Sequence, residues 1–391
     1  MRDAADVVDI AIVGAGAIGL AVARELGRAG IRDVVLLDRE PAPGQGSTAR
    51  ANGGVRAQWR TRPNIAFSQF TIPQLAALDR DTAGLAGFRQ AGYLFFTGTA
   101  SGEADLRKGW ELQRECGVDV AWLSPAQVLH HAPFIRPDGL RAGTFCATDG
   151  FIDPHGVVQA LWSQVKAMGI EGRFGTDVTS MKRTREGFVL TTTTGEMTAR
   201  WLVNAAGPYA DRVAALLSID LPCRPVRRNL ACTEPGAGYD ATVPPLIPMC
   251  IDLDTGVLIR RESGGFLIAW SNPDDPPGTD TSVDPDFLPQ LAERIGNRFP
   301  FLEPIGISPK NCWAGLYPET PDHHAIIGPV DGVPGFLLCV GFGGHGIMHS
   351  IAAGRAIAEL IADGGSTTLD IHALRLSRFA EGDLILETAV L

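Results

Sequence analysis

The fold is decided by residues 8–38, which read VDIAIVGAGAIGLAVARELGRAGIRDVVLLD. An apolar run rich in β-formers enters a glycine-rich turn, a helical pattern follows, and a second apolar run ends on Asp38. In this arrangement Gly14 permits the tight turn, Gly16 lets a diphosphate approach the backbone, and Gly19 lets helix and strand pack closely. The stretch therefore predicts a Rossmann-like βαβ unit that binds a dinucleotide.

Both ends of this unit favour a particular ligand group. The start of the helix presents free N–H groups and the positive end of the helix dipole, which suits a diphosphate. The carboxylate of Asp38 can accept hydrogen bonds from both ribose hydroxyls and would repel a 2′-phosphate. Only residues 1–7 precede the motif. NAD enzymes often place this unit after a catalytic domain, whereas many FAD enzymes begin with it, so we predict FAD.

Composition restricts the class of protein. The 391 residues suffice for two domains with their own cores. A net charge of −10 argues against nucleic acid as a partner. Seven scattered cysteines without a CxxC pair indicate reduced thiols and no metal site. The N-terminus carries acids where a signal peptide needs positive charge, so we predict a cytoplasmic protein, with peripheral attachment to the inner membrane as a second option.

Three further glycine-rich stretches are expected to face the same ligand. Residues 44–59, GQGSTARANGGVRAQW, form a loop that can lay backbone amides along a diphosphate and the edge of a flavin ring. Residues 204–211, NAAGPYAD, repeat the pattern of strand, glycine turn and helix start. Residues 341–346, GFGGHG, open a helix whose N-terminus favours negative charge on a reduced flavin.

The order of strand and helix patterns predicts an α/β protein with two discontinuous domains. We assign residues 1–86, 146–220 and 322–391 to a Rossmann-like FAD-binding domain. The remaining segments, 87–145 and 221–321, form an α+β substrate-binding domain. Within it, the proline- and aspartate-rich residues 272–286 are predicted to form a solvated surface turn.

Five motifs follow one another along the chain: GAGAIG, GSTARANGGVRAQ, NAAGPYAD, WAGLYPETPDHHAIIG and GFGGHGIMHS. Together they resemble the D-amino-acid oxidase/sarcosine oxidase superfamily of FAD enzymes. The resemblance covers nearly the whole chain. It is strongest to the branch of β-type proline dehydrogenases, sarcosine oxidase β subunits and opine oxidase subunits. It implies a mixed-sheet substrate domain with the flavin ring between the domains. It also implies oxidation of an amine C–N bond by hydride transfer to flavin N5, giving an imine that hydrolyses.

The motifs and the resemblance together predict the residues that contact FAD. They are Gly14, Gly16, Ala17, Ile18, Gly19, Asp38, Arg39, Gly46, Ser47, Thr48, Asn52, Gly53, Gly54, Val55, Val178, Ala206, Gly207, Gly315, Gly341, Gly343, Gly344, His345, Gly346, Ile347 and Met348. Some relatives attach the flavin through a histidine after GST, where this chain has Arg50 and Ala51. Others use a cysteine just before Thr-Pro-Asp, and Cys312 lies too far upstream. We therefore predict noncovalent FAD.

Substrate contacts are predicted less directly. Relatives that carry the motif WAGLRP hold the substrate carboxylate with its arginine, and this chain has Tyr317 at that position. Monomeric sarcosine oxidases have a lysine at the position where this chain has Met348. The remaining carboxylate anchors are Arg56 and Arg260, because a guanidinium pairs well with a carboxylate. With His345 at the flavin edge, the candidate catalytic residues are Arg56, Tyr317, His345, Arg260 and Met348. Histidines 323 and 324 show no metal-ligand spacing and are expected at surface or loop positions.

Several alternatives stay open at this point. The same fold serves 2-hydroxy acid dehydrogenases, and a flavoprotein subunit or assembly factor could depend on a separate partner chain. An NAD-only dehydrogenase would leave GFGGHG and NAAGPYAD unexplained. The expected substrate is an amino acid or secondary amine, and its electrons pass to oxygen, to a quinone, or to hetero-oligomeric partner subunits.

Overall fold

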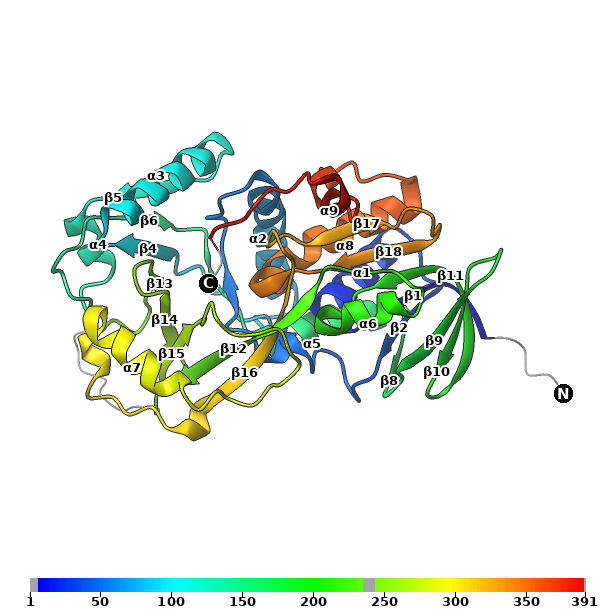
Figure 1. Cartoon of the computed structure of the whole chain (residues 1–391), viewed down its shortest axis with the longest axis horizontal. Helices are drawn as coiled ribbons and strands as arrows, with labels where there is room; N and C mark the ends of the chain where they lie inside the picture. Colours follow the sequence, from blue (N-terminus) through cyan, green and yellow to red (C-terminus); the bar gives the residue numbers. More distant parts are fainter. Residues whose placement is uncertain (1–5, 235–242, 390–391) are drawn as a thin grey trace.

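Two eight-stranded sheets form the two lobes seen side by side in Figure 1. The computed structural model describes residues 6–234 and 243–389. The first lobe takes its strands from the segments that the sequence assigns to the FAD domain, and the second from those assigned to the substrate domain. The predicted fold class, an α/β protein with a second, mixed sheet, is confirmed; the domain boundaries stay a prediction.

The first sheet is centred on the strand of the glycine motif. Its strand order is β17 (Ile326–Pro329), β18 (Phe336–Val340), β11 (Gly195–Asn204), β1 (Asp6–Val13), β2 (Val34–Asp38) and β8 (Glu171–Phe174). β1 runs parallel to both β2 and β11. The antiparallel pair β9 (Val178–Arg183) and β10 (Phe188–Thr192) continues from β11. β11 is one continuous strand because β1 pairs along most of its length.

Alternating side chains of β1 serve two cores, as the period of a strand requires. Ile10 and Ile12 face helices that cover one side of the sheet, whereas Ala11 and Val13 belong to the core on the other side. The first group of helices is α1 (Ala17–Arg28), α2 (Arg62–Asp81), α5 (Pro154–Ala167) and α8 (Gly346–Asp363). The second side carries the shorter α6 (Ala210–Ala215) and α9 (Arg378–Glu381).

The second sheet is mixed. Its order is β16 (Cys312–Glu319), β12 (Arg224–Cys232), β15 (Gly265–Trp270), β14 (Val257–Glu262), β13 (Met249–Asp252), β4 (Tyr93–Thr97), β6 (Ala142–Cys146) and β5 (Val120–Leu123). Its parallel contact is β13 with β4, which joins the two separate segments of this lobe. Three helices pack on it: α3 (Ala100–Glu115), α4 (Pro125–His131) and α7 (Phe287–Arg298).

The two lobes meet at a small strand pair, β3 (Gly54–Val55) with β7 (Gly150–Phe151). The segment that follows α9, drawn in red in Figure 1, returns to this junction between the lobes. There the carbonyl oxygen of Ala389 accepts a hydrogen bond from Arg56. Within the described ranges, no helix is both long enough and apolar enough to cross a membrane.

Residues 272–286 form the predicted surface loop, since most of them are exposed, but some of their carboxylates also pair with β12. Asp275 is nearly covered and lies 3.8 Å from Arg228 of β12. Asp280 and Asp284 pair with Arg227 at 3.3 and 3.0 Å. The acidic loop therefore folds back onto β12, because two consecutive arginines on that strand attract its carboxylates.

Candidate functional site

The turn after β1 is held by close backbone contacts. Gly14 has a φ of +108°, and a Cβ there would lie 2.3 Å from the carbonyl oxygen of Ala205. Its N–H donates to the carbonyl of Leu37 at 2.8 Å. A Cβ on Gly19 would lie 1.8 Å from the carbonyl oxygen of Gly14. Because only glycine fits these positions, the turn is locked between β1, β2 and β11.

The start of α1 and the end of β2 face one another. The N–H of Ala17 donates to Oγ1 of Thr48 at 3.2 Å. Asp38 accepts hydrogen bonds from the N–H of Ala15 at 2.7 Å and of Glu40 at 2.9 Å. Burial raises the pKa of Asp38, while the two backbone donors act against this rise. The carboxylate is thereby held in place at the position where a ribose would bind.

A long cavity, partly open to solvent, runs from this turn to β16 of the second lobe. Most residues predicted to contact the cofactor border it. They are Gly14, Gly16, Ala17, Ile18, Asp38, Arg39, Gly46, Ser47, Thr48, Asn52, Gly53, Gly54, Val178, Ala206, Gly207, Gly341, Gly343, Gly344, Gly346 and Ile347. Tyr317 borders the same cavity at its far end.

Five predicted cofactor contacts do not border the cavity: His345, which is described below, and four others. Gly19 packs beneath the turn, and Val55 and Met348 are buried in the apolar core of the first lobe. A Cβ on Gly315 would lie 3.1 Å from Cβ of Arg50, so this glycine makes room for that side chain. The structure thus assigns these four residues to packing rather than to the surface of the cavity.

The residues present fit FAD. The N-termini of α1 and α8 both open onto the cavity, and Asp38 stands at its other edge. A Cβ on Gly54 would lie 1.9 Å from the hydroxyl of Tyr93, and one on Gly344 would lie 2.4 Å from the ring of Tyr317. Glycine amides and a carboxylate along an extended cavity match the diphosphate and ribose of a dinucleotide.

Arg56 lies at the junction of the lobes and is buried. Its Nη1 donates to the carbonyl of Gln58 at 2.7 Å, and its Nη2 donates to the carbonyl of Ala389. The guanidinium carbon lies 3.7 Å from the ring centre of Trp59. Burial lowers the pKa of Arg56. Within the described ranges no ion pair joins this guanidinium to a carboxylate, so it is a buried cation that can receive an anionic ligand.

The other two candidate anchors differ from Arg56. Arg260 already pairs with Glu262 at 2.6 Å and donates to the carbonyl of Asn52 at 2.9 Å. It borders a separate hollow beside β7. Tyr317 presents its side chain to the main cavity, and burial raises the pKa of its hydroxyl, which stays protonated. The structure therefore favours Arg56 over Arg260 as a free cation.

His345 is a buried side chain with an unused polar atom. Its Nε2 has no hydrogen-bond partner among the described residues. The ring centre lies 5.0 Å from that of Trp59 and 4.9 Å from that of His349. Burial lowers the pKa of His345 well below its ordinary value, and that of His349 to about 3. Both imidazoles are therefore neutral at physiological pH, and His345 can still hydrogen-bond a ligand.

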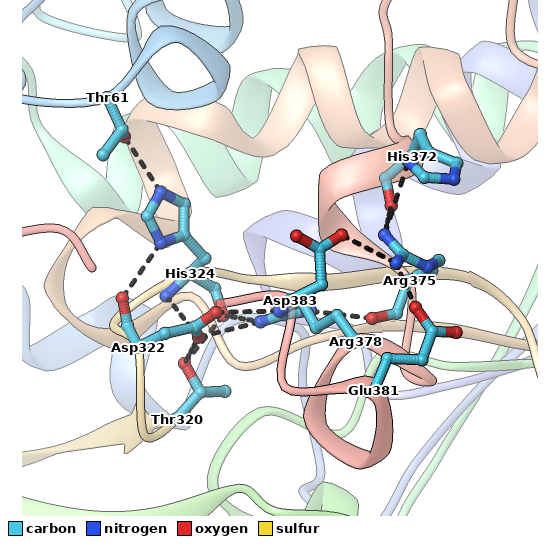
Figure 2. A network of polar contacts seen from close by, with 9 residues as sticks. All are labelled: Thr61, Thr320, Asp322, His324, His372, Arg375, Arg378, Glu381 and Asp383. Carbon is cyan, nitrogen blue, oxygen red and sulfur yellow. Dashed lines mark hydrogen bonds and ion pairs between the residues drawn. The ribbon is translucent and has the colours of Figure 1, made fainter. Parts of the chain in front are cut away.

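A second polar network, shown in Figure 2, fixes the TPDHH motif. His324 is buried, with Nε2 2.9 Å from Oγ1 of Thr61 and Nδ1 2.9 Å from the carbonyl of Asp322. Arg378 of α9 pairs with Asp322 at 2.8 and 2.9 Å. Burial alone would raise the pKa of Asp322, but Arg378 holds it below its ordinary value. His324 is thus a core residue of the first lobe and not a surface residue.

Two polar side chains near Arg56 and Tyr317 were not singled out from the sequence. Arg228 lies 5.7 Å from the ring centre of Tyr317, and its buried Nε has no partner among the described residues. Asp149 is fully buried beside Gln58. Arg228 lies opposite Gly315 in the sheet, a pairing that the sequence does not reveal. Asp149 gave no signal in the sequence, because its contacts are 91 or more positions away.

Comparison with known proteins was made on the whole chain. A family model described as "FAD dependent oxidoreductase" (DAO) matches residues 9–360. FAD-dependent oxidoreductase domain-containing protein 1 of Xenopus laevis is 30% identical over 429 residues, covering 97% of this chain and 84% of that protein. Glycine oxidase of Geobacillus kaustophilus is 26% identical, covering 95% and 97%.

The solved structure of L-proline dehydrogenase from P. horikoshii superposes with a TM-score of 0.91 at 24% sequence identity. The match covers 98% of this chain and 100% of that chain. This likeness extends over both lobes and shows a shared fold.

Proposed function

The chain belongs to the DAO family of FAD-dependent oxidoreductases, and from this premise we propose that it oxidises the C–N bond of an amino acid or N-substituted amino acid. When bound, FAD supplies the acceptor for a hydride from the substrate carbon. The product of that step is an imine, which water hydrolyses. The names of the relatives support an amine as substrate, since they include a glycine oxidase and dimethylglycine dehydrogenases.

The observation that carries the proposal is the buried guanidinium of Arg56. It follows Gly53 and Gly54, which border the main cavity, and only carbonyl oxygens engage its donors within the described ranges. A guanidinium has five N–H donors, so three are not engaged by these two contacts and could bind a carboxylate while the present contacts persist. An amino acid substrate would thereby be oriented by its carboxylate, which is what hydride transfer chiefly requires.

The neutral histidines favour the reactive form of an amine. Because burial keeps His345 and His349 uncharged, the site places no second cation on that side of Arg56. An amine must lose its proton before its carbon can release a hydride, and the unpartnered Nε2 of His345 can hydrogen-bond the neutral nitrogen. Tyr317, protonated at neutral pH, can donate a second hydrogen bond from the opposite wall.

The test is anaerobic titration of the FAD-loaded protein, followed by the visible absorption of oxidised flavin. Sarcosine, L- and D-proline, hydroxyproline, glycine, an opine and 2-hydroxyglutarate are added in turn. Bleaching by an amine supports the proposal. Bleaching by 2-hydroxyglutarate alone would replace it with hydroxy acid oxidation, and an unbleached flavin would favour a subunit that needs a partner chain. The rate at which colour returns in air separates an oxidase from a dehydrogenase that uses another acceptor.

A matched pair of variants tests the role of Arg56. We expect Arg56→Lys to lower kcat/KM by about 100-fold, because a buried guanidinium–carboxylate contact is lost. Arg260→Lys is the control: its guanidinium is already paired with Glu262, so the decrease should be much smaller. Equal decreases in the two variants would contradict the assignment of Arg56.

A further inference from the structure

A buried carboxylate lies beside the anchor that the proposed function uses. Asp149 occupies the turn between β6 and β7, where the chain crosses from the second lobe to the first. Its side chain is 0% exposed. Within the described residues no ion pair joins it to a lysine or arginine. A buried carboxylate without such a partner is costly unless hydrogen bonds hold it, and its contacts are therefore informative.

Both oxygens of this carboxylate accept hydrogen bonds from residues that directly follow Arg56. Oδ1 accepts from the N–H of Ala57 at 2.8 Å, and Oδ2 accepts from Nε2 of Gln58 at 3.1 Å. The Gln58 amide is fixed further by Thr144, whose hydroxyl donates to Oε1 at 2.8 Å. Exchanging the positions of the amide nitrogen and oxygen of Gln58 would therefore break both its hydrogen bond to Asp149 and the one from Thr144.

These contacts determine where the guanidinium of Arg56 points. The carbonyl of Gln58 accepts from Nη1 of Arg56 at 2.7 Å, so the residue whose side-chain amide binds Asp149 also supplies the carbonyl that holds the guanidinium. Trp59, next in the chain, supplies the ring on which the guanidinium stacks at 3.7 Å. A shift of residues 57 and 58 would move both supports of Arg56 together.

We propose that Asp149 is a positioning residue for Arg56: its ionised carboxylate holds residues 57 and 58 so that the guanidinium faces the substrate carboxylate. This rests on the proposed role of Arg56 as the anchor. The ionised form is required because both neighbours, the Ala57 N–H and the Gln58 amide, are donors. A protonated acid, or an asparagine, would direct a donor of its own at one of them.

The surroundings of Asp149 make this requirement pH-dependent. Burial raises the pKa of Asp149 to about 6, against its hydrogen bonds from Ala57 and Gln58 and the charge of Arg56. The other titratable groups facing it are Tyr93 of β4 and Cys146 of β6, and burial raises the pKa of both, so they stay neutral. Glu387 of the C-terminal segment acts on Arg56 from the opposite side. Asp149 alone of this group changes charge near pH 6.

The experiment measures binding of pyrrole-2-carboxylate, a planar carboxylate probe, through its effect on the visible spectrum of the FAD-loaded protein. We expect Asp149→Asn to raise Kd about tenfold at neutral pH. In the wild type Kd should rise as pH falls through about 6, and this transition should disappear in the variant. The control is Asp252→Asn, which alters another buried carboxyl whose pKa burial raises, in contact with Thr255 and remote from Arg56.

Two further measurements separate this proposal from the proposed function. In the Arg56→Lys background, Asp149→Asn should have little additional effect, because it acts through Arg56; independent effects would overturn the proposal. Crystal structures of the loaded wild type and Asp149→Asn test positioning without any probe. An Arg56 guanidinium unmoved from the Gln58 carbonyl and the Trp59 ring in the variant would overturn it. If the wild type does not bind the probe, the anchor role of Arg56 fails, and the two structures still decide whether Asp149 positions that side chain.

Discussion

The cofactor half and the substrate half of the site are built by different means. On the cofactor side the contacts are made by backbone, and the side chains matter mainly by being absent, as at Gly14 and Gly19. On the substrate side a few long side chains are held by partners far away in sequence. Arg56 and Ala389 are 333 positions apart, and Gln58 and Asp149 are 91 apart.

This difference has a consequence for sensitivity to change. The backbone cradle, meaning the glycine turn at Gly14 and Gly19, loses its structure when an atom is added, because the neighbouring backbone cannot move aside. A side-chain site fails when a partner is removed, because a buried charge or donor is then left unsatisfied. The two halves should therefore respond to opposite kinds of substitution, and variants can test this.

The largest effect on activity is expected from adding one carbon atom to the cradle. In Gly19→Ala the new Cβ would lie 1.8 Å from the carbonyl oxygen of Gly14, a backbone atom that β1 and β2 hold. We expect a loss of about 3 kcal/mol in the free energy of unfolding and loss of FAD binding. Thermal unfolding and the flavin content of the purified protein measure both.

The matched control is Gly46→Ala. Gly46 borders the same cavity, but a Cβ there meets nothing within 4 Å. This variant should fold with stability close to wild type and retain FAD. If Gly19→Ala and Gly46→Ala have the same stability and the same FAD content, the close backbone contacts of Gly19 do not restrict the cradle as their distances indicate.

The next effect is expected from removing a partner near the substrate half. Arg378→Met leaves Asp322 buried without its cation, and we expect a cost of about 3–5 kcal/mol in unfolding free energy. Because Arg378 lowers the pKa of Asp322, this stabilisation is present above the ordinary pKa of an aspartate and is lost as pH falls. The difference in unfolding free energy between wild type and Arg378→Met should accordingly become smaller at acidic pH.

Arg375→Met provides the comparison for this pair. Arg375 lies in the same network of Figure 2 but pairs with the exposed carboxylates of Glu381 and Asp383. Solvent screens these pairs, so its unfolding midpoint should change little. The Arg378 variant should also raise KM, since the carbonyl of Asp322 accepts from the N–H of Glu387 in the segment that reaches Arg56. If KM does not change, the network of Figure 2 does not influence the substrate site.

The same contrast explains what could be predicted from the sequence. The predicted β1–α1–β2 unit is confirmed, because hydrophobic period and glycine spacing are local signals. β16 was not predicted: CWAGLYPE contains glycine and proline and lacks alternation, and its strand conformation follows from pairing with β12. β13 has only four residues and was missed for a similar reason.

Within the site, the sequence could nominate a residue only where a motif carries it. Arg56 was a candidate because it follows GGV in the flavin loop, and the structure buries it at the junction of the lobes. Its partners Gln58, Asp149 and Ala389 were not predicted, since a contact between distant side chains leaves no periodic pattern. Met348 was expected near the flavin from its motif, yet its side chain is buried in the apolar core of the first lobe.

The smallest effect is expected at Cys312, where the prediction of noncovalent FAD can be tested. Cys312 begins β16, pairs with Ala231 of β12, and lies 3.6 Å from the carbonyl of Ser308 on the outer part of the second lobe. It does not border the main cavity, and burial raises the pKa of its thiol, so the reactive thiolate is scarce. Cys312→Ser should therefore leave flavin content, absorption and kcat unchanged. Denaturation should release free FAD from both proteins; flavin that stays with the wild-type polypeptide, but not with the serine variant, would show that one side chain of the substrate half reaches the cofactor covalently.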